Sequence, residues 1–196
     1  MRLLIATTNP GKVREYADLC AGLPCELVGL VDVGINMDVE ESGATYEENA
    51  LLKACEYAAQ SGLLTLADDS GLEVDALQGR PGVHSARYAP DSPARIQKLL
   101  AEMQDAPDDQ RRARFQCVIA LARPAGQTET TQGSCEGWIA REPRGVNGFG
   151  FDPVFYMPEH HATMAELPES FKNTISHRAH AAQKMRLILE QVLAES

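Results

Sequence analysis

One stretch decides how this chain is interpreted: Leu63-Leu64-Thr65-Leu66-Ala67-Asp68-Asp69-Ser70-Gly71-Leu72. Its apolar run, Leu63 to Ala67, predicts a buried strand that carries the two acids at its C-terminal end, where open α/β sheets bind their ligands. Adjacent carboxylates repel each other, and a divalent cation such as Mg²⁺, which takes oxygen ligands, would neutralise them. The alternative is a solvated strand-to-turn junction in which Asp69 or Ser70 bonds its own backbone.

The segments before this stretch alternate between strand and helix patterns. We expect a strand over residues 3–7, a helix over 12–20, a strand over 26–30 and a helix from the N-cap Thr45 to Gly62. The spacing of small and apolar residues in the second helix is typical of one buried face.

The segments after it add a helix that begins at the N-cap Ser92, a long hairpin with strands over 115–122 and 128–139, and a last helix that opens at Ser176. Strand–helix units combined with a hairpin predict the α/β class with a mixed sheet.

Length, charge and cysteine content limit the classes to which this protein can belong. The 196 residues suffice for a single domain, or two tightly joined lobes, with a substantial core. The formal charge of −10 argues against a nucleic-acid polymer or an anionic membrane as the main partner. The apolar start is too short for a signal peptide, and no run reaches membrane-spanning length. Five cysteines without Cys-x-x-Cys spacing favour free thiols in a reducing cytoplasm.

A candidate phosphate-binding loop, Thr7-Thr8-Asn9-Pro10-Gly11-Lys12, connects the first strand to the first helix. A helix N-terminus offers backbone N–H groups and a positive dipole end, so it binds phosphate readily. Gly11 allows close approach of the backbone, and Lys12 adds a charge. The alternative is an ordinary turn in which Asn9 and Pro10 start the helix.

An acidic cluster over residues 38–48 leads into the second helix. Glu47 and Glu48 are explained by capping, because Thr45-Tyr46-Glu47-Glu48 is a capping-box pattern. Glu40 and Glu41 precede the cap, in a loop bounded by glycines, and could complete a metal site with Asp69.

Two later segments carry further candidates. The loop Gly145-Val146-Asn147-Gly148-Phe149-Gly150-Phe151-Asp152-Pro153 would present phenylalanine rings for base stacking, or else use them to fill the core. Four polar residues mark the start of the last helix: Lys172, Ser176, His177 and Arg178. Cations are unfavourable at a helix N-terminus, so this cluster suits an anion or a carbonyl oxygen, or is a solvated face.

Taken in order, these motifs resemble the inosine triphosphate pyrophosphatase family. They are Thr7 to Lys12, Asp68 to Leu72, Phe149 to Pro153 and Ile175-Ser176-His177-Arg178, with Glu48-Asn49-Ala50 and Ser85-Ala86-Arg87-Tyr88. The resemblance implies an elongated, twisted mixed sheet flanked by helices, in two lobes with the active-site cleft between them. It also implies a homodimer, Mg²⁺ dependence, and hydrolysis of ITP, dITP and XTP to the monophosphate and pyrophosphate, which removes deaminated purines from the nucleotide pool.

The resemblance implies roles for individual residues. The triphosphate would be held by Thr7, Thr8, Asn9, Pro10, Gly11 and Lys12. Glu41 and Asp69 would bind Mg²⁺, Asp69 would act as general base, and Ser70 would touch the substrate. The nucleotide, mainly its base, would be bound by Phe149, Gly150, Phe151, Asp152, Lys172, His177 and Arg178. Whether Asp68 or Glu40 also faces the metal stays open, and many members have Gly at Thr8 and Tyr at Phe151.

For selectivity, our hypothesis is that Arg178, with His177, recognises the 6-keto oxygen, because arginine carries only donors whereas adenine presents a donor there. Two alternatives to this function remain at the level of sequence. One is a Maf-like pyrophosphatase acting on modified pyrimidine nucleotides, and the other is a non-hydrolytic nucleotide-binding module.

Overall fold

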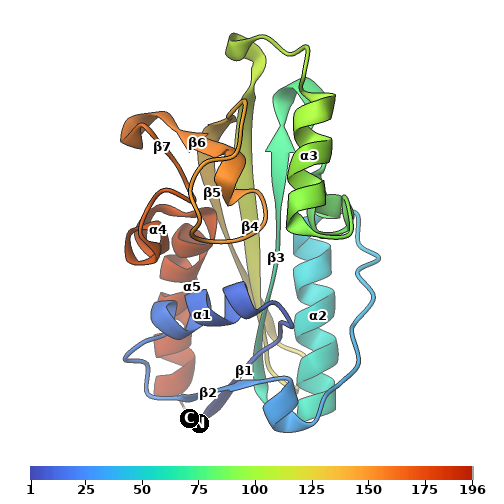
Figure 1. Cartoon of the computed structure of the whole chain (residues 1–196). Helices are drawn as coiled ribbons and strands as arrows, with labels where there is room; N and C mark the ends of the chain where they lie inside the picture. The colour runs from blue at the N-terminus through green and yellow to red at the C-terminus, as the bar shows by residue number, and fades with distance from the viewer. Residues whose placement is uncertain (196) are drawn as a thin grey trace. The chain divides into compact units, whose positions relative to one another are not determined.

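A computed structural model describes residues 1–195 of the chain (Figure 1). Its described residues form a seven-stranded sheet in the order β2-β1-β3-β4-β5-β6-β7. The strands are β1 (Arg2–Ile5), β2 (Glu26–Gly29), β3 (Leu64–Val74), β4 (Arg112–Ala122), β5 (Thr128–Ile139), β6 (Phe155–Met157) and β7 (Ala162–Thr163). The helices are α1 (Pro10–Leu19), α2 (Tyr46–Ser61), α3 (Ser92–Glu102), α4 (Glu169–Ile175) and α5 (His177–Ala194).

The sheet is mixed, which confirms the predicted α/β class. β1 pairs in parallel with both β2 and β3, whereas β6 pairs antiparallel with β5 and with β7. Contacts divide the chain into two compact units: unit 1 holds residues 1–69, 117–133 and 178–195, and unit 2 holds residues 70–116 and 134–177. A single domain over residues 1–196, of which residue 196 lies outside the described part, stays a prediction, as does the cleft.

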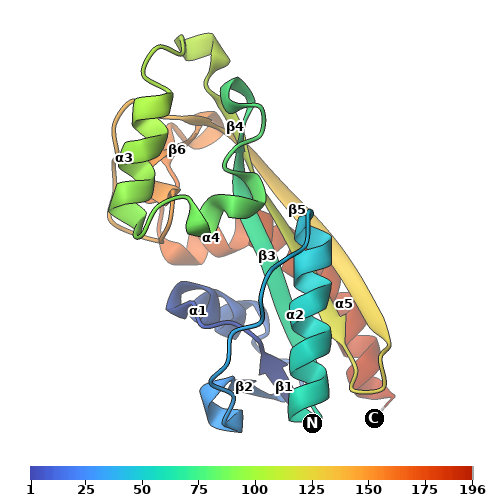
Figure 2. The same cartoon turned by 90° about the vertical axis from the view of Figure 1, so that its right-hand side faces the viewer.

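Unit 1 packs helices against both faces of its strands. Successive residues of a strand point to opposite faces. Leu64 and Leu66 of β3 therefore lie in one buried cluster with residues of α1 and α5, and Ala67 lies in another with residues of α2. Figure 1 shows the same arrangement, with α1 and α5 on one side of β1 and β3 and α2 on the other, and Figure 2 views the strands from the side of α2.

The strand β3 does not end at the acids, so that prediction is wrong. It continues to Val74, because Leu72 and Val74, both 0% exposed, enter the core of unit 2 and keep the chain extended. What ends near the acids is the pairing with β1, whose last partner is Leu66. Asp68 and Asp69 thus follow the carboxyl end of the parallel part of the sheet, although they lie inside a longer strand.

Helix ends follow local capping chemistry. The predicted capping box of α2 is confirmed, since Thr45 and Glu48 exchange side-chain-to-backbone bonds, and Gly62 ends the helix in the left-handed conformation at φ +67°. The N-cap of α3 is Asp91 rather than Ser92, because the Asp91 carboxylate accepts the Ala94 N–H at 2.8 Å.

At the other predicted helix starts, α1 begins two residues earlier than expected, and Ser176 lies between α4 and α5. The short helix α4 was not predicted.

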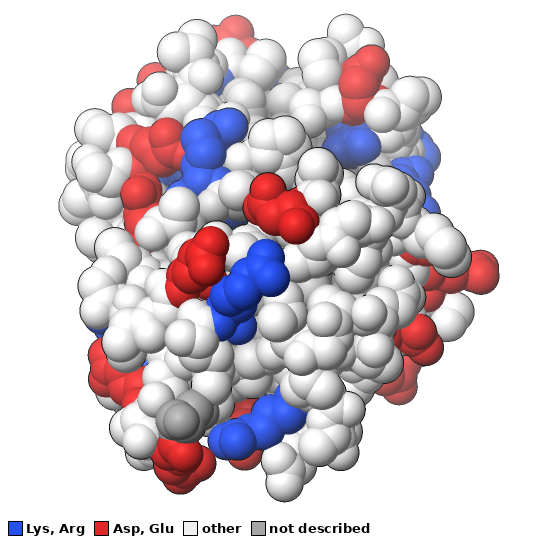
Figure 3. Space-filling view, turned by 90° about the horizontal axis from the view of Figure 1, so that it is seen from below, with Lys and Arg blue, Asp and Glu red and all other residues white. Residues whose placement is uncertain are grey.

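Unit 2 has one buried cluster, formed by α3 together with the adjoining ends of β3, β4 and β5 and by β6. Within residues 1–195, no helix is both long enough and apolar enough to span a bilayer. On the face that Figure 3 shows, basic side chains lie among acidic ones.

Candidate active site

Asp68 and Asp69 are both buried, at 2% and 6% exposure, but they contact different helices. Asp68 bonds residues of α1 and α5, whereas Asp69 bonds Asn49 of α2. Strand alternation produces this separation, because Asp68 shares the face of Leu66 and Asp69 shares the face of Ala67. The two acids therefore face different helices, with Lys12 and Arg178 against Asp68 and Lys53 beside Asp69.

Asp68 is the centre of a buried ion network. Its Oδ2 lies 3.0 Å from Lys12 Nζ, and it accepts bonds from Arg178 Nε at 3.2 Å and Nη2 at 3.1 Å. Arg178 also pairs with Glu15 of α1. Burial alone would raise the pKa of Asp68, but Lys12 and Arg178 outweigh it and hold the pKa well below its usual range. Asp68 is therefore a permanent anion and a poor proton acceptor.

The network bears on the selectivity hypothesis. Arg178 is 1% exposed, and its guanidinium donates to carboxylates of unit 1 on both Asp68 and Glu15. His177, in unit 2, is 5% exposed and stacks on Phe115 with ring centroids 4.6 Å apart. These contacts indicate positioning roles, and recognition of a base by either side chain stays a prediction.

Asp69 has an environment that suits a general base. Its Oδ2 accepts a bond from Asn49 Nδ2 at 3.1 Å, and its Oδ1 lies 3.8 Å from Lys53 Nζ. Burial, with a further contribution from Glu41, raises the pKa of Asp69 despite the opposing charge of Lys53. A carboxylate with a raised pKa accepts a proton from water more readily than an ordinary aspartate does.

The helix α2 and the loop before it position this site. Asn49 and Lys53 are four residues apart, so they lie on the same face of the helix. The Asn49 side-chain oxygen also accepts the Gly43 N–H at 2.8 Å, which holds the loop that carries Glu41. A Cβ at Gly43 would lie 2.7 Å from that oxygen, so this close approach requires glycine. Glu41 in turn forms an ion pair with Lys53.

Lys53 is the functional candidate that the sequence analysis missed. Burial lowers its pKa, but neighbouring carboxylates more than compensate, so the amine stays charged. The available signal was the spacing of Asn49 and Lys53, two polar residues on a helix face lined by Ala50 and Ala54. Glu40 is exposed, and Glu48 bonds the Ala44 and Thr45 N–H groups as a cap.

The protein supplies few donors for a metal, so water or a ligand must complete its shell. Within residues 1–195, no group of three or more His, Cys, Asp or Glu side chains is placed to hold a metal ion. Glu41 and Asp69 nevertheless both approach one cation, the Lys53 ammonium. Mg²⁺ uses one or two carboxylates and completes its shell with water and substrate phosphates. The pair therefore fits a Mg²⁺ ion whose shell is completed by water and by the phosphates of a ligand.

The loop from Thr7 to Lys12 forms the turn that was the alternative to a phosphate site. Asn9 Oδ1 accepts the N–H groups of Gly11 at 2.8 Å and Lys12 at 3.4 Å, and Thr7 Oγ1 accepts the Asn9 N–H at 3.2 Å. Thr8 and Pro10 are exposed. Phosphate binding by this loop stays a prediction, and a phosphate would have to compete with the Asn9 cap.

In unit 2, three of the predicted nucleotide-binding residues form one cluster. Lys172 Nζ lies 2.6 Å from Asp152 Oδ2 and 4.6 Å from the centroid of the Phe149 ring. The same carboxylate oxygen accepts the Phe149 N–H at 2.9 Å. Gly148 has φ +72°, and a Cβ there would lie 2.0 Å from Asp152 Oδ2, so the loop closes only with glycine. The cluster holds a half-buried phenylalanine ring over a buried ammonium.

Phe151 is placed differently from Phe149. It is 4% exposed and belongs to the core of unit 2, with its ring centroid 6.3 Å from that of Tyr88. Its ring fills the core, as the alternative for this loop expected, and base stacking by Phe151 stays a prediction. Gly150, at φ +63°, separates the two rings, and Ser70 is half-buried in β3.

Comparisons with known proteins agree with the motifs. The model of the Ham1 family matches residues 3–188. A dITP/XTP pyrophosphatase of Bacillus licheniformis is 46% identical over 192 residues, which cover 96% of this chain and 98% of that protein. One of Geobacillus kaustophilus is 50% identical over 194 residues, covering 97% and 95%. The solved structure of a HAM1 protein from Coxiella burnetii has a TM-score of 0.88 at 42% identity and covers 100% of both chains. The resemblance is confirmed, and the chain belongs to the Ham1 family.

Proposed function

We propose that this protein hydrolyses the non-canonical purine nucleoside triphosphates ITP, dITP and XTP to the nucleoside monophosphate and pyrophosphate. The names of the relatives support the substrate class. The observation that carries the chemistry is the buried Asp69, held by Asn49 and placed beside Lys53 and Glu41 with a raised pKa. The names of the relatives do not favour a Maf-like activity on modified pyrimidines.

We assign Asp69 as the general base. A water molecule loses its proton to Asp69, its oxygen forms the new bond to phosphorus, and the bond between the α- and β-phosphates breaks. Asn49 fixes one carboxylate oxygen, and the other lies 3.8 Å from Lys53 Nζ. Asp68 does not compete for the proton, because its cations keep it ionised. A positioned base of this kind contributes about 10²–10⁴-fold to the rate.

Glu41 and Asp69 would hold Mg²⁺. When bound, the ion would neutralise the charge of the triphosphate and stabilise the leaving pyrophosphate. Lys12, which pairs with Asp68, lies at the start of α1, where the loop from residue 7 would receive the phosphate tail. In unit 2, the half-buried ring of Phe149 would stack on the purine, since stacking needs only a π-face.

The same proposal includes a homodimer. Unit 2 carries a groove of about 570 Å³ lined in part by Trp138, Tyr156, Arg141, Arg144 and Asp108. Trp138 and Tyr156 are cross-strand partners, and tryptophan, tyrosine and arginine are the types enriched at interface centres. The groove holds both signs of charge, so two copies can match it about a two-fold axis. Light scattering tests this: Trp138→Ala with Tyr156→Ala should give a monomer.

We place the protein in the cytoplasm, which the free thiols of all five cysteines support. The expected partner is a small nucleotide and not a nucleic-acid polymer, in keeping with the formal charge of −10.

A pyrophosphate-release screen over nucleoside triphosphates, with and without Mg²⁺, tests the function. Release from ITP, dITP and XTP well above ATP and GTP supports it. Preference for modified UTP would indicate a Maf-like enzyme. Thermal stabilisation by ITP without pyrophosphate release would indicate a non-hydrolytic binding module. Asp69→Asn serves as the inactive control.

A further inference from the structure

Lys53 occupies the place that a metal ion would need. Its side chain is 12% exposed, its ammonium pairs with Glu41 Oε1, and it lies 3.8 Å from Asp69 Oδ1. Asn49 holds the other oxygen of Asp69, so Oδ1 is the oxygen turned toward the ammonium. One cation thus engages both carboxylates that are the candidate Mg²⁺ ligands.

This arrangement has a physical reason. Two carboxylates brought together away from water repel each other unless a cation lies between them. An unpaired buried charge is strongly destabilising. Lys53 supplies that charge from the middle of α2.

We propose that Lys53 is the resident counter-cation of this site and that a divalent ion displaces its ammonium from Glu41 and Asp69. The inference rests on the proposed metal site. An ion bound to both carboxylates would be repelled by an ammonium left in place. Lysine carries its charge on a flexible four-carbon stem, so the ammonium can swing away while α2 stays fixed. Loading the site is therefore an exchange of one cation for another.

The exchange predicts that Lys53 weakens metal binding in the absence of nucleotide. Lys53→Met removes the competing cation, and we expect Mn²⁺ to bind about tenfold more tightly than to the wild type. Lys53→Arg keeps a positive charge at the site, so its affinity should stay near that of the wild type. A merely structural role for Lys53 would weaken binding in both variants.

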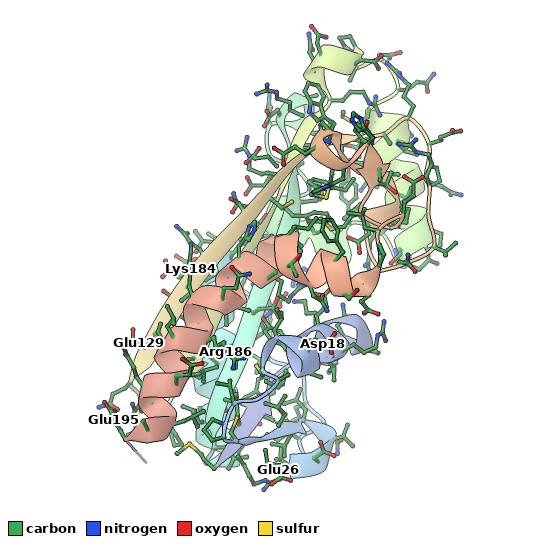
Figure 4. All side chains as sticks on the ribbon, turned by 90° about the vertical axis from the view of Figure 1, so that its left-hand side faces the viewer. Asp18, Glu26, Glu129, Lys184, Arg186 and Glu195 are labelled. Carbon is green, nitrogen blue, oxygen red and sulfur yellow. The ribbon has the colours of Figure 1, made fainter. Side chains whose placement is uncertain are left out.

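The matched control is Lys184→Met. Lys184 is labelled on α5 in Figure 4, is exposed, and donates to the Gln132 carbonyl at 2.7 Å. This variant makes the same change of net charge away from the carboxylates. Its Mn²⁺ affinity should equal that of the wild type.

The experiment titrates nucleotide-free protein with Mn²⁺ and follows the free ion by electron paramagnetic resonance, with Mg²⁺ as competitor. Tighter binding by Lys53→Met alone supports the exchange. Equal or weaker binding by Lys53→Met, or equal tightening by Lys53→Arg, overturns it. Absence of binding by every protein also overturns it.

A second measurement covers the case in which Lys53→Met does not fold. Wild-type crystals soaked in Mn²⁺ should show an anomalous peak beside Glu41 and Asp69 with Lys53 Nζ moved out of contact. A peak there with the ammonium still on Glu41 overturns the inference. Pyrophosphate release from ITP, measured on the same wild-type protein, separates this result from failure of the proposed function.

Discussion

Replacing Asp68 with asparagine should strongly lower the free energy of unfolding. Its direct effect on the hydrolysis step should be much smaller. The substitution keeps the shape of the side chain but removes the charge that neutralises Lys12 and Arg178. Arg178 is 1% exposed, and its ion pair with Glu15 would remain. Breaking a buried ion pair costs about 3–5 kcal/mol, and because two cations lose their partner we expect the upper part of that range.

The loss should depend on pH in a defined direction. The folded-state pKa of Asp68 lies below that of the unfolded chain, which is about 3.9 for an aspartate. Its carboxylate therefore contributes full stability above the unfolded value and loses that contribution as the pH falls through the folded value. The difference in unfolding free energy between wild type and variant should be constant near neutral pH and should shrink below roughly pH 4.

Urea unfolding followed by two probes measures this difference. Trp138 is the one tryptophan of the chain and reports on unit 2, whereas far-ultraviolet circular dichroism reports on both units. Coincident transitions are needed before a single free energy is assigned. Asp69→Asn, the same change at the next residue, is the control for stability. A loss below about 1 kcal/mol for Asp68→Asn, or a loss that persists unchanged at acid pH, would refute the reasoning.

Three further changes test the candidate site. Asp69→Asn should lower kcat for ITP by about 10²–10⁴-fold while the protein stays folded, and turnover near that of the wild type would remove its assignment as base. Lys172→Met leaves Asp152 charged and buried, so the KM for ITP should rise and the urea midpoint of unfolding should fall. An unchanged midpoint would show that the Lys172–Asp152 pair adds no stability. Gly148→Ala forces a Cβ onto Asp152 and should lower the melting temperature more than Gly150→Ala, which meets open space; equal shifts would mean that the steric clash is relieved.

Local chemistry explains why parts of the fold were predictable. The start of α2 follows from Thr45 and Glu48, and its end follows from Gly62 in the left-handed conformation. The hairpin strands β4 and β5 follow from β-forming residues on either side of a turn. These signals lie within a few residues of the structure they determine.

The site depends on contacts that local patterns do not contain. Arg178 meets Glu15 across 163 positions of sequence, and Lys53 meets Glu41 across a loop. Nothing in the spacing shows which of Phe149 and Phe151 turns into the core. Side chains alternate in any strand, so the opposite orientation of Asp68 and Asp69 could have been predicted from the sequence. It was not, because the predicted strand ended at Ala67.

The alternation in β3 also limits how the length of this protein can change. Inserting or deleting a single residue ahead of Asp68, with the helices in place, would exchange the environments of the two acids. Asp68, which is a poor proton acceptor, would then face α2. Asp69, the proposed base, would lie between Lys12 and Arg178. Such a change alters no side chain, yet it would damage stability and chemistry together. Loops far from β3 have no such constraint, so tolerated insertions belong in turns such as the one over residues 123–127.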